Sequence, residues 1–292
     1  MTVPPNSIGR MLGIVGDEWT LLIVQQSLLG VRRYAGFRAA LPISDAVLTT
    51  RLGQLTSLGL LERRAYRDAP ARHEYPLTAC GRGLWPVLLG IWDWERTWVP
   101  GQARALPAMA HTGCGAEFRP LLACRACRAP VVARDVVGGW GPSGSWPRSV
   151  PVGTTRRRAT SGLFPSSMAM FGNRWSAALL GAAFLGVRRF GGFATHLAVP
   201  PTVLAERLRT FTAIGVLEPM PDGGYHLTDK GRAFYPTIAT ALRWAEHWFP
   251  APEGPALSLA HGACGAPFVP DLHCDHCQDR LAGKTVLRRD PT

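Results

Sequence analysis

The apolar residues of the first hundred positions fall into helical stretches followed by two short extended ones. Helices are predicted at residues 19–29, ending at Gly30, and at residues 34–40, before the helix-breaking Pro42. A third helix, capped by Ser44 or Asp45, is predicted from apolar positions at helical spacing: Val47, Leu48, Leu52, Leu55 and Leu58. Residues 60–64 and 73–77 are predicted strands on either side of a turn at residues 68–71, and Thr78 caps a last long helix.

Three helices followed by a two-stranded hairpin are typical of a winged helix-turn-helix. In that fold the third helix can enter the major groove of DNA, while the hairpin reaches the flanking backbone or the minor groove. Short capped helices occur in many folds, so the order of the elements alone is weak evidence.

The chain repeats this pattern about 156 residues later. Gly30-Val31-Arg32-Arg33-Tyr34 is matched by Gly186-Val187-Arg188-Arg189-Phe190, and Gly59-Leu60-Leu61-Glu62 is matched by Gly215-Val216-Leu217-Glu218. A duplicated module keeps residues where the same backbone and core are built, so each copy is a check on the other.

Several strings within the first copy closely resemble the HxlR-type winged-helix transcriptional regulators of the MarR-like superfamily. They are the Trp-Thr helix start, Gly-x-Arg-Arg-Tyr/Phe-x-x-Phe, the Arg-Leu of the third helix and Tyr-x-Leu-Thr-x-x-Gly-Arg, and the resemblance extends to both copies, about two thirds of the chain. It implies a DNA-binding regulator, more often a repressor, that acts as a homodimer through its terminal helices. Here one chain could supply both halves as an intramolecular pseudo-dimer, and a homodimer of chains stays open.

Each copy ends in the same set of metal-ligand residues. His111-x2-Cys114 followed by Cys124-x2-Cys127 recurs, 150 residues later, as His261-x2-Cys264 and Cys274-x2-Cys277. Two ligands separated by two residues can bind one metal from a tight turn, and two such turns complete a tetrahedron. Three thiolates and one imidazole favour zinc, and four protein ligands indicate a structural site. We therefore expect about two structural zinc ions per chain; a redox-responsive site and an empty relic are the alternatives.

The remaining cysteine and two histidines are less informative. Cys80 could be a sensor thiol, although a small neutral residue is the commoner reading, and redox-sensing relatives use a cysteine nearer the N-terminus. His273 and His276 flank a ligand, but the first copy has alanines at these positions, so we expect them at the surface.

The predicted fold is mainly α with small β-hairpins (α+β), made of two winged helix-turn-helix domains, each followed by a small zinc ribbon. The first winged helix is placed at residues 1–100 and its ribbon at 101–135, the second winged helix at 163–250 and its ribbon at 251–292. Residues 136–162 are rich in Gly, Pro, Ser and Arg and are predicted to be a linker. Its arginine triplet, residues 156–158, either contacts phosphate or is only solvated.

In the first copy, the third helix and the hairpin supply the candidate DNA contacts. Short polar side chains suit base edges, arginines suit phosphate, and the alternative for Ser44 and Asp45 is that they only cap the helix. The residues are Arg32, Arg33, Ser44, Asp45, Thr49, Thr50, Arg51, Gln54, Arg63, Arg64, Arg67 and Arg72.

The second copy differs where DNA contacts would be made. Its hairpin is six residues shorter, lacks arginine and carries Glu218 and Asp222, which would repel phosphate. The candidate contacts that remain are Arg188, Arg189, Thr202, Arg207 and Arg209. We therefore expect the first copy to be the stronger DNA reader.

The charge balance favours a polyanionic partner: 32 basic and 20 acidic residues give a net charge of +12. Residues 1–10 lack the apolar core of a signal peptide, and the longest uncharged apolar run, residues 175–187, is shorter than the roughly 20 residues of a membrane span. We expect a cytoplasmic, nucleoid-associated protein with double-stranded DNA as partner, no membrane contact, and an optional small-molecule effector that no residue set identifies. A protein-interaction module without specific DNA binding is the alternative; an enzyme is a distant third, because we find no nucleophile–base set, phosphate loop or open metal site.

Overall fold

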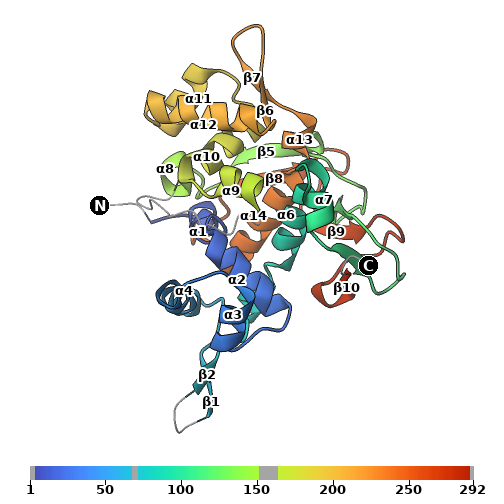
Figure 1. The fold of residues 1–292 in the computed structure, drawn as a ribbon. Coiled ribbons are helices and arrows are strands. Elements are labelled where there is room, and N and C mark those ends of the chain that lie inside the picture. Colours follow the sequence, from blue (N-terminus) through green and yellow to red (C-terminus); the bar gives the residue numbers. More distant parts are fainter. Residues whose placement is uncertain (1–3, 68–71, 151–163, 290–292) are drawn as a thin grey trace.

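A computed structural model of the chain describes residues 4–67, 72–150 and 164–289 (Figure 1). The first copy contains helices α1 (Ser7–Val15), α2 (Glu18–Leu28), α3 (Tyr34–Ala40), α4 (Asp45–Ser57), α5 (Ala79–Arg82), α6 (Trp85–Trp98) and α7 (Gln102–Ala105). Its hairpin is β1 (Arg64–Arg67) and β2 (Arg72–Glu74), and its tail holds β3 (Ala108–His111), β4 (Pro120–Cys124), the 3-10 turn Ala133–Asp135, β5 (Val136–Trp140) and α8 (Trp146–Ser149).

The second copy has the same order of elements, except that α7 and α8 have no counterpart among its described residues. Its helices are α9 (Pro165–Phe171), α10 (Arg174–Phe184), α11 (Phe190–Leu197), α12 (Pro201–Ala213), α13 (Asp229–Arg232) and α14 (Tyr235–Trp248). The hairpin is β6 (Leu217–Pro219) and β7 (Tyr225–Leu227), and the tail holds β8 (Leu257–His261), β9 (Pro270–Cys274), the 3-10 turn Gly283–Thr285 and β10 (Val286–Arg289). No helix among the described residues is long and apolar enough to cross a membrane.

The three helices and the hairpin predicted for each winged helix are present, with shifts at their edges. Ser44 caps α4 as predicted, but Val47 and Leu58 are exposed, so the buried stripe of this helix is Leu48, Leu52 and Leu55. The first strand begins at Arg64 rather than at residue 60, because the preceding residues are held by a single bridge between Leu61 and Leu77. The predicted turn at residues 68–71 and the arginine triplet at 156–158 lie outside the described residues.

The N-terminal helix α1 was not predicted from the sequence. Asn6 accepts a hydrogen bond from the backbone of Gly9 and caps α1, whose apolar residues follow at helical spacing: Ile8, Met11, Leu12, Ile14 and Val15. The capping residue and the helical spacing of the apolar residues were therefore present in the sequence.

The two copies meet through their long helices, α6 and α14, at the centre of the molecule. Trp94 of α6 donates its indole N–H to the backbone oxygen of Lys230 at 2.9 Å, and Trp244 of α14 donates to the backbone oxygen of Cys80, also at 2.9 Å. Trp94 and Trp244 are 150 residues apart, as are Cys80 and Lys230. The contact is therefore reciprocal, as in a two-fold dimer, and each buried indole satisfies its donor on the other copy.

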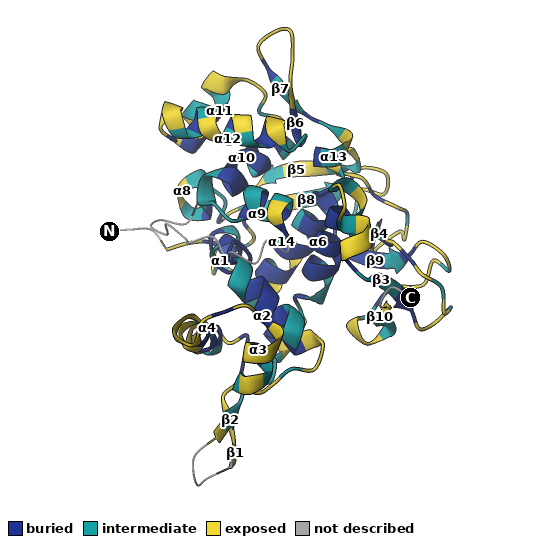
Figure 2. Ribbon diagram, viewed as in Figure 1, coloured by how far each residue is buried: buried dark blue, intermediate teal, exposed yellow. Residues whose placement is uncertain are grey.

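The N-terminal helix of each copy packs on the long helix of the other. Ser7 of α1 donates to Glu246 of α14 at 2.6 Å, and the backbone of Ser167 in α9 donates to Glu95 of α6 at 2.7 Å. Glu95 is fully buried, and its pKa is raised above the ordinary value by desolvation. Figure 2 shows the result as a buried centre around α6 and α14, with exposed residues along α11, α12 and the hairpins.

Among the described residues, each tail strand forms its two-stranded sheet with a strand of the other copy, while isolated bridges such as Ala110–Glu117 lie within one tail. β4 pairs antiparallel with β9, with Leu122 opposite Leu272, and these two residues are equivalent in the two copies. β3 pairs with β10, and β8 pairs with β5, in matching register. The expectation of a separate ribbon after each winged helix is therefore wrong for the described residues, because each tail forms its sheets with strands of the other copy.

The predicted linker differs from the structure at its start. Residues 136–140 form β5, and residues 146–149 form α8, which packs on α1. The buried side chain of Asn6 donates to Ser149 at 2.9 Å and to the backbone oxygen of Ser143 at 3.1 Å. A Gly- and Pro-rich composition suggested a linker, but Gly138 is required here because a Cβ would lie 2.0 Å from the backbone oxygen of Ser258.

A glycine substitution tests the α6–α14 packing. A Cβ at Gly90 would lie 2.7 Å from the hydroxyl of Thr237 in α14, so Gly90→Ala should destabilise the chain by about 1–3 kcal/mol through overpacking. The matched control is Gly53→Ala in α4, where a Cβ meets open space and helix propensity favours alanine by up to about 1 kcal/mol. Urea unfolding measures both; equal effects of the two substitutions would contradict the close helix contact.

Candidate nucleic-acid interface and metal centres

The exposed face of α4 carries most of the predicted base-reading residues. Thr49, Thr50 and Gln54 are exposed there. Ser44 accepts a hydrogen bond from the backbone of Val47 at 3.4 Å and therefore acts as the helix cap. The carboxylate of Asp45, also exposed, lies 2.8 Å from Arg38 and accepts from the hydroxyl of Tyr34 at 2.8 Å, so it ties α3 to the start of α4.

Arg51 was predicted to reach phosphate, but the structure gives it a structural partner. Its guanidinium lies 2.9 Å from the carboxylate of Asp17, which is 4% exposed and caps α2 through the backbone of Thr20. The same side chain donates to Gln54 at 2.9 Å. The ion pair joins the start of α2 to α4, and removing either partner would leave the other charge unpaired in a partly buried site.

The hairpin of the first copy carries exposed arginines on and beside both strands. Arg63 and Arg64 lie at its start and Arg72 on β2, while the side chain of Arg67 lies outside those described. Arg64 pairs with Glu62 at 3.1 Å, where both side chains are more than half exposed, so the pair is weak and leaves the arginine available. At the base of the hairpin, the guanidinium of Arg33 lies 4.4 Å from the ring centre of Tyr66, and Arg32 is exposed beside it.

The second copy presents fewer cations in the same places. Thr202 and Arg209 are exposed on α12, whereas Arg207 is half-buried and lies against its neighbour Glu206. Arg207 corresponds to Arg51, and the partner of Arg51, Asp17, is replaced by Asn173. The Nε atom of Arg207 is buried and has no hydrogen-bond partner among the described residues. The second copy therefore lacks the ion pair that Arg51 makes in the first.

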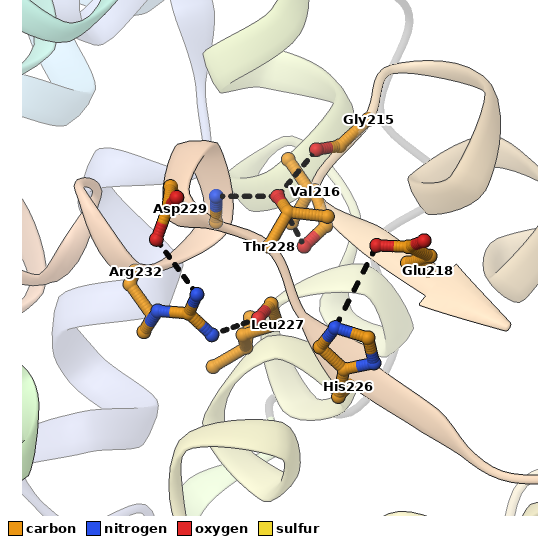
Figure 3. A network of polar contacts seen from close by, with 9 residues as sticks. Gly215, Val216, Glu218, His226, Leu227, Thr228, Asp229 and Arg232 are labelled. Atoms are coloured by element: carbon orange, nitrogen blue, oxygen red, sulfur yellow. Dashed lines mark hydrogen bonds and ion pairs between the residues drawn. The ribbon is translucent and has the colours of Figure 1, made fainter. Parts of the chain in front are cut away.

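Acidic residues of the second hairpin lie near the arginines that precede α11. Arg188 and Arg189 are exposed, and Asp222 lies 3.9 Å from Arg189. Glu218 on β6 lies 3.6 Å from His226 on β7 (Figure 3). The hairpin therefore presents carboxylates where the first copy presents guanidinium groups.

Both hairpins join their following helix through the same polar network, shown for the second copy in Figure 3. Thr228 donates to the backbone oxygen of Gly215 at 2.6 Å and caps α13 by accepting from the backbone of Gly231. Arg232 donates to the backbone oxygen of Leu227 and to Asp229. The first copy repeats the threonine bond from Thr78 to Gly59 at 2.6 Å and the arginine bond from Arg82 to Leu77. The Leu-Thr-x-x-Gly-Arg string thus anchors the wing.

The metal-ligand residues form two clusters, each with atoms within 4.8 Å of one another. One cluster is His111, Cys114, Cys274 and Cys277, and the other is Cys124, Cys127, His261 and Cys264. The sulfur atoms of Cys114 and Cys274 are 3.9 Å apart, and Cys277 lies 3.3 Å from Nδ1 of His111. With Zn–S bonds of about 2.3 Å, a tetrahedron has S–S edges of about 3.8 Å, so these separations fit a four-coordinate ion.

The backbone after each ligand pair has the same turn. The residues that follow the second ligand are Gly115, Arg128, Gly265 and Gln278, with φ of 73°, 62°, 69° and 63°. Each pair thus turns its two ligand atoms towards one point in the same way. The predicted pairing of the two turns within one copy is wrong: each cluster takes a His-x2-Cys pair from one copy and a Cys-x2-Cys pair from the other.

The other cysteine and histidines lie outside both clusters. Cys80 is 7% exposed, and burial raises the pKa of its thiol to about 11, which disfavours the reactive thiolate. His276 is exposed, and His273 lies 2.8 Å from the backbone oxygen of Gln278, in line with the expectation that neither is a ligand.

Comparison with known proteins places the winged helices in one family. The family model for "HxlR-like helix-turn-helix" matches residues 14–103 and 170–253, more than half of the chain. An uncharacterised HTH-type transcriptional regulator of Mycobacterium tuberculosis is 37% identical over 137 residues, which make 47% of this chain and 87% of that relative. YvaP of Bacillus subtilis, also named an uncharacterised HTH-type transcriptional regulator, is 37% identical over 31% of this chain and 84% of its own length.

A solved structure from Pseudomonas aeruginosa, PA1374, described as a proposed transcription factor, is 31% identical. The match covers 49% of this chain and 97% of that one, with a TM-score of 0.38. A TM-score below 0.5 adds nothing on the fold. The Mycobacterium match shows that this relative is about as long as one of the two copies.

Two aspartate substitutions compare the stability that is lost with the buried Asp17–Arg51 pair and with the exposed Asp45–Arg38 pair. Asp17→Ala removes both the cap of α2 and the partner of a half-buried guanidinium, and should cost about 2–4 kcal/mol. Asp45→Ala removes a pair whose carboxylate is mostly exposed, and should cost less than about 1 kcal/mol. Thermal and urea unfolding compare them, and a loss for Asp17→Ala no larger than that for Asp45→Ala would contradict the structural role of the Asp17–Arg51 pair.

Proposed function

Because this chain belongs to the HxlR-like helix-turn-helix family, we propose that it is a sequence-specific DNA-binding transcriptional regulator, acting as a repressor and with its first copy as the main DNA reader. Relatives named HTH-type transcriptional regulators support the general function. The repressor role follows the commoner behaviour of the family it resembles. In this proposal the protein works on double-stranded DNA in the cytoplasm.

The observation that carries the proposal is the arginine-bearing hairpin of the first copy beside an exposed recognition helix. Arg63, Arg64 and Arg72 are exposed, and the one ion pair of Arg64 is solvated. Arginines on a wing neutralise phosphates and release counterions, which supplies affinity without reading sequence. Thr49, Thr50 and Gln54 on α4 would read base edges, and Ser44 and Asp45 act mainly in positioning that helix.

The second copy lacks two features of the first copy that favour tight DNA binding: the arginines of the hairpin and the ion pair of the recognition helix. Its hairpin is lined by Glu218 and Asp222, and its recognition helix lacks the ion pair that fixes α4 in the first copy. Arg188, Arg189 and Arg209 stay exposed and would give backbone contacts of lower affinity. In this proposal the operator is asymmetric, with one half-site bound tightly and one weakly.

One chain would do the work of a dimer in this proposal. The reciprocal α6–α14 contact brings two winged helices together, with the hairpins at opposite ends of the molecule in Figure 1. Because both winged helices belong to one chain, binding of one to DNA raises the effective concentration of the other at the neighbouring half-site.

We further propose that each Cys/His cluster holds one structural zinc ion. The donor set of three sulfurs and one imidazole suits zinc, and the spacing fits a tetrahedron with no open position. The two ions would stabilise the fold by joining the tail of one copy to the tail of the other, and no chemical step is assigned to them.

Removal of arginines from the wing tests the DNA proposal. Replacing both Arg63 and Arg64 by Ala should weaken binding to the upstream region of the protein's own gene about 10–100-fold and reduce the salt slope by about 2, because two phosphate contacts are lost. Replacing Arg104 and Arg134 by Ala, two exposed arginines outside the winged helices, removes the same charge. Fluorescence anisotropy at several salt concentrations measures both variants. Equal loss in both, or unchanged binding in the wing variant, would refute the wing assignment.

Removal of metal tests the structural role of the clusters. The purified chain should contain two zinc ions per molecule by elemental analysis. Stripping them with a strong chelator should lower Tm by more than ~10 °C, because structural zinc contributes on the order of 10 kcal/mol to folding. Re-addition of zinc should restore Tm, whereas Mg²⁺ should not. A metal-free chain with unchanged Tm would contradict this role.

A further inference from the structure

A cavity of about 460 Å³ lies where the two copies meet. Its walls come from α1, β5 and α8 of the first copy and from α10, α14 and β8 of the second. We call it the aromatic cavity after its rings, which are Trp140, Trp146, Phe171, Phe184 and Tyr235. A volume of this size is that of a small-molecule site, which spans about 300–1,000 Å³.

The rings approach the cavity from both copies. Trp140 and Trp146, from the first copy, meet edge to face with centres 4.9 Å apart. Phe184 and Tyr235, from the second copy, lie 5.5 Å apart. The described residues of the wall include no Asp, Glu, Lys, Arg or His. Such a wall favours a neutral ring compound, since a charged group would lose its hydration without gaining a partner.

One polar group in the wall lacks a protein partner. Tyr235 is 8% exposed, and no hydrogen bond of its hydroxyl is found among the residues that the structure describes. Burial raises the pKa of this phenol, so the hydroxyl keeps its proton and can donate. The hydroxyl can therefore donate to an acceptor on a ligand in the cavity.

The matched cavity of the other copy provides a comparison within the same chain. It has a volume of about 440 Å³ and is lined by α2, α6, β3 and β10. Position 181 in the aromatic cavity is glycine, whereas its counterpart in the other cavity is Gln25, and Tyr235 corresponds to Trp85. A Cβ at Gly181 would meet open space. Glycine is a poor helix former, yet it stands in α10 at a position where a larger side chain would occupy the cavity.

We propose that the aromatic cavity binds a neutral, planar compound of one or two rings that carries a hydrogen-bond acceptor, and that Tyr235 donates to this acceptor. The aromatic side chains pack on the faces and edges of the ligand, and Gly181 leaves the space that it fills. The other cavity, which carries Gln25, Gln26 and Arg288 among its walls, does not select such a compound.

A regulatory consequence rests on the proposed function. The helix α10, which forms one wall, packs against both α11 and the recognition helix α12. A ligand at this wall would shift the second winged helix relative to α14 and change DNA affinity. Binding to the cavity itself can be measured without DNA, so failure of the DNA proposal and failure of the site are distinguishable.

Calorimetric titration of the full zinc-loaded chain with coumarin tests the site, because coumarin is a neutral bicyclic ring with a carbonyl acceptor. We expect one saturable site per chain. Naphthalene, which lacks the acceptor, should bind about tenfold more weakly, a difference of one hydrogen bond. Coumarin-3-carboxylate should also bind more weakly, because its charge has no partner in the wall.

Variants locate the site. Gly181→Phe should abolish coumarin binding by filling the cavity, whereas Gln25→Phe, the matched change in the other cavity, should leave it unchanged. Tyr235→Phe should weaken coumarin about tenfold and leave naphthalene unchanged, because only the hydroxyl is removed. Circular dichroism and zinc content check that each variant is folded.

Three results would overturn the proposal. The first is coumarin binding that survives Gly181→Phe in a folded protein. The second is equal loss of coumarin and naphthalene in Tyr235→Phe. The third is the absence of saturable binding, up to ~1 mM, of coumarin, chromone and 1-indanone alike.

Discussion

The exchange of tail strands between the two copies constrains the rest of the molecule. β3 and β8 each find their partner strand in the other copy, and β4 and β9 pair across the two-fold relation at Leu122 and Leu272. The ligand pairs follow these strands, so each cluster is built from both tails. A copy on its own would leave strand edges unpaired and half of each ligand set absent, both of which are unfavourable. The two winged helices are therefore held at a fixed relation by contacts far from their DNA-facing surfaces.

This constraint explains which residues the two copies share and which they do not. The tryptophan donors of α6 and α14, the Thr-x-x-Gly-Arg network and the eight ligand residues serve the common scaffold, and both copies have them. The exposed side chains of the hairpins and recognition helices lie outside that scaffold, so these residues could change without loss of folding. Arg63 and Arg64 in one hairpin and Glu218 and Asp222 in the other are the outcome.

Much of the local structure could be predicted from the sequence, because helical periodicity and capping residues are local properties. Ser44 and Thr78 were recognised as caps, and the duplication picked out the eight residues that form the two clusters. The partition of those ligands could not be predicted. Both copies have identical spacing, so pairing within a copy and pairing between copies satisfy the same sequence rule, and only the strand register decides between them.

Two other features depended on tertiary contacts that spacing does not reveal. The partner of Arg51 is Asp17, which is 34 positions away and buried by the packing of α2, so an arginine that looked free to meet phosphate is a structural residue. Residues 136–150 have a linker composition, yet their glycines allow β5 to approach β8 closely, and Asn6 anchors the segment. Composition describes what a segment can do alone, whereas these residues are ordered by β8 of the other copy and by Asn6 of their own.

The most direct measurement of the central claim is the zinc content of two double variants. Cys114→Ser with Cys274→Ser removes two ligands of one cluster, whereas Cys114→Ser with Cys124→Ser removes one ligand from each. If the clusters are shared between the copies, the first variant should keep one zinc ion per chain and the second should lose tight binding of both. The reverse result, with one ion kept by the second variant and none by the first, would show that each copy binds its own metal and would contradict the account.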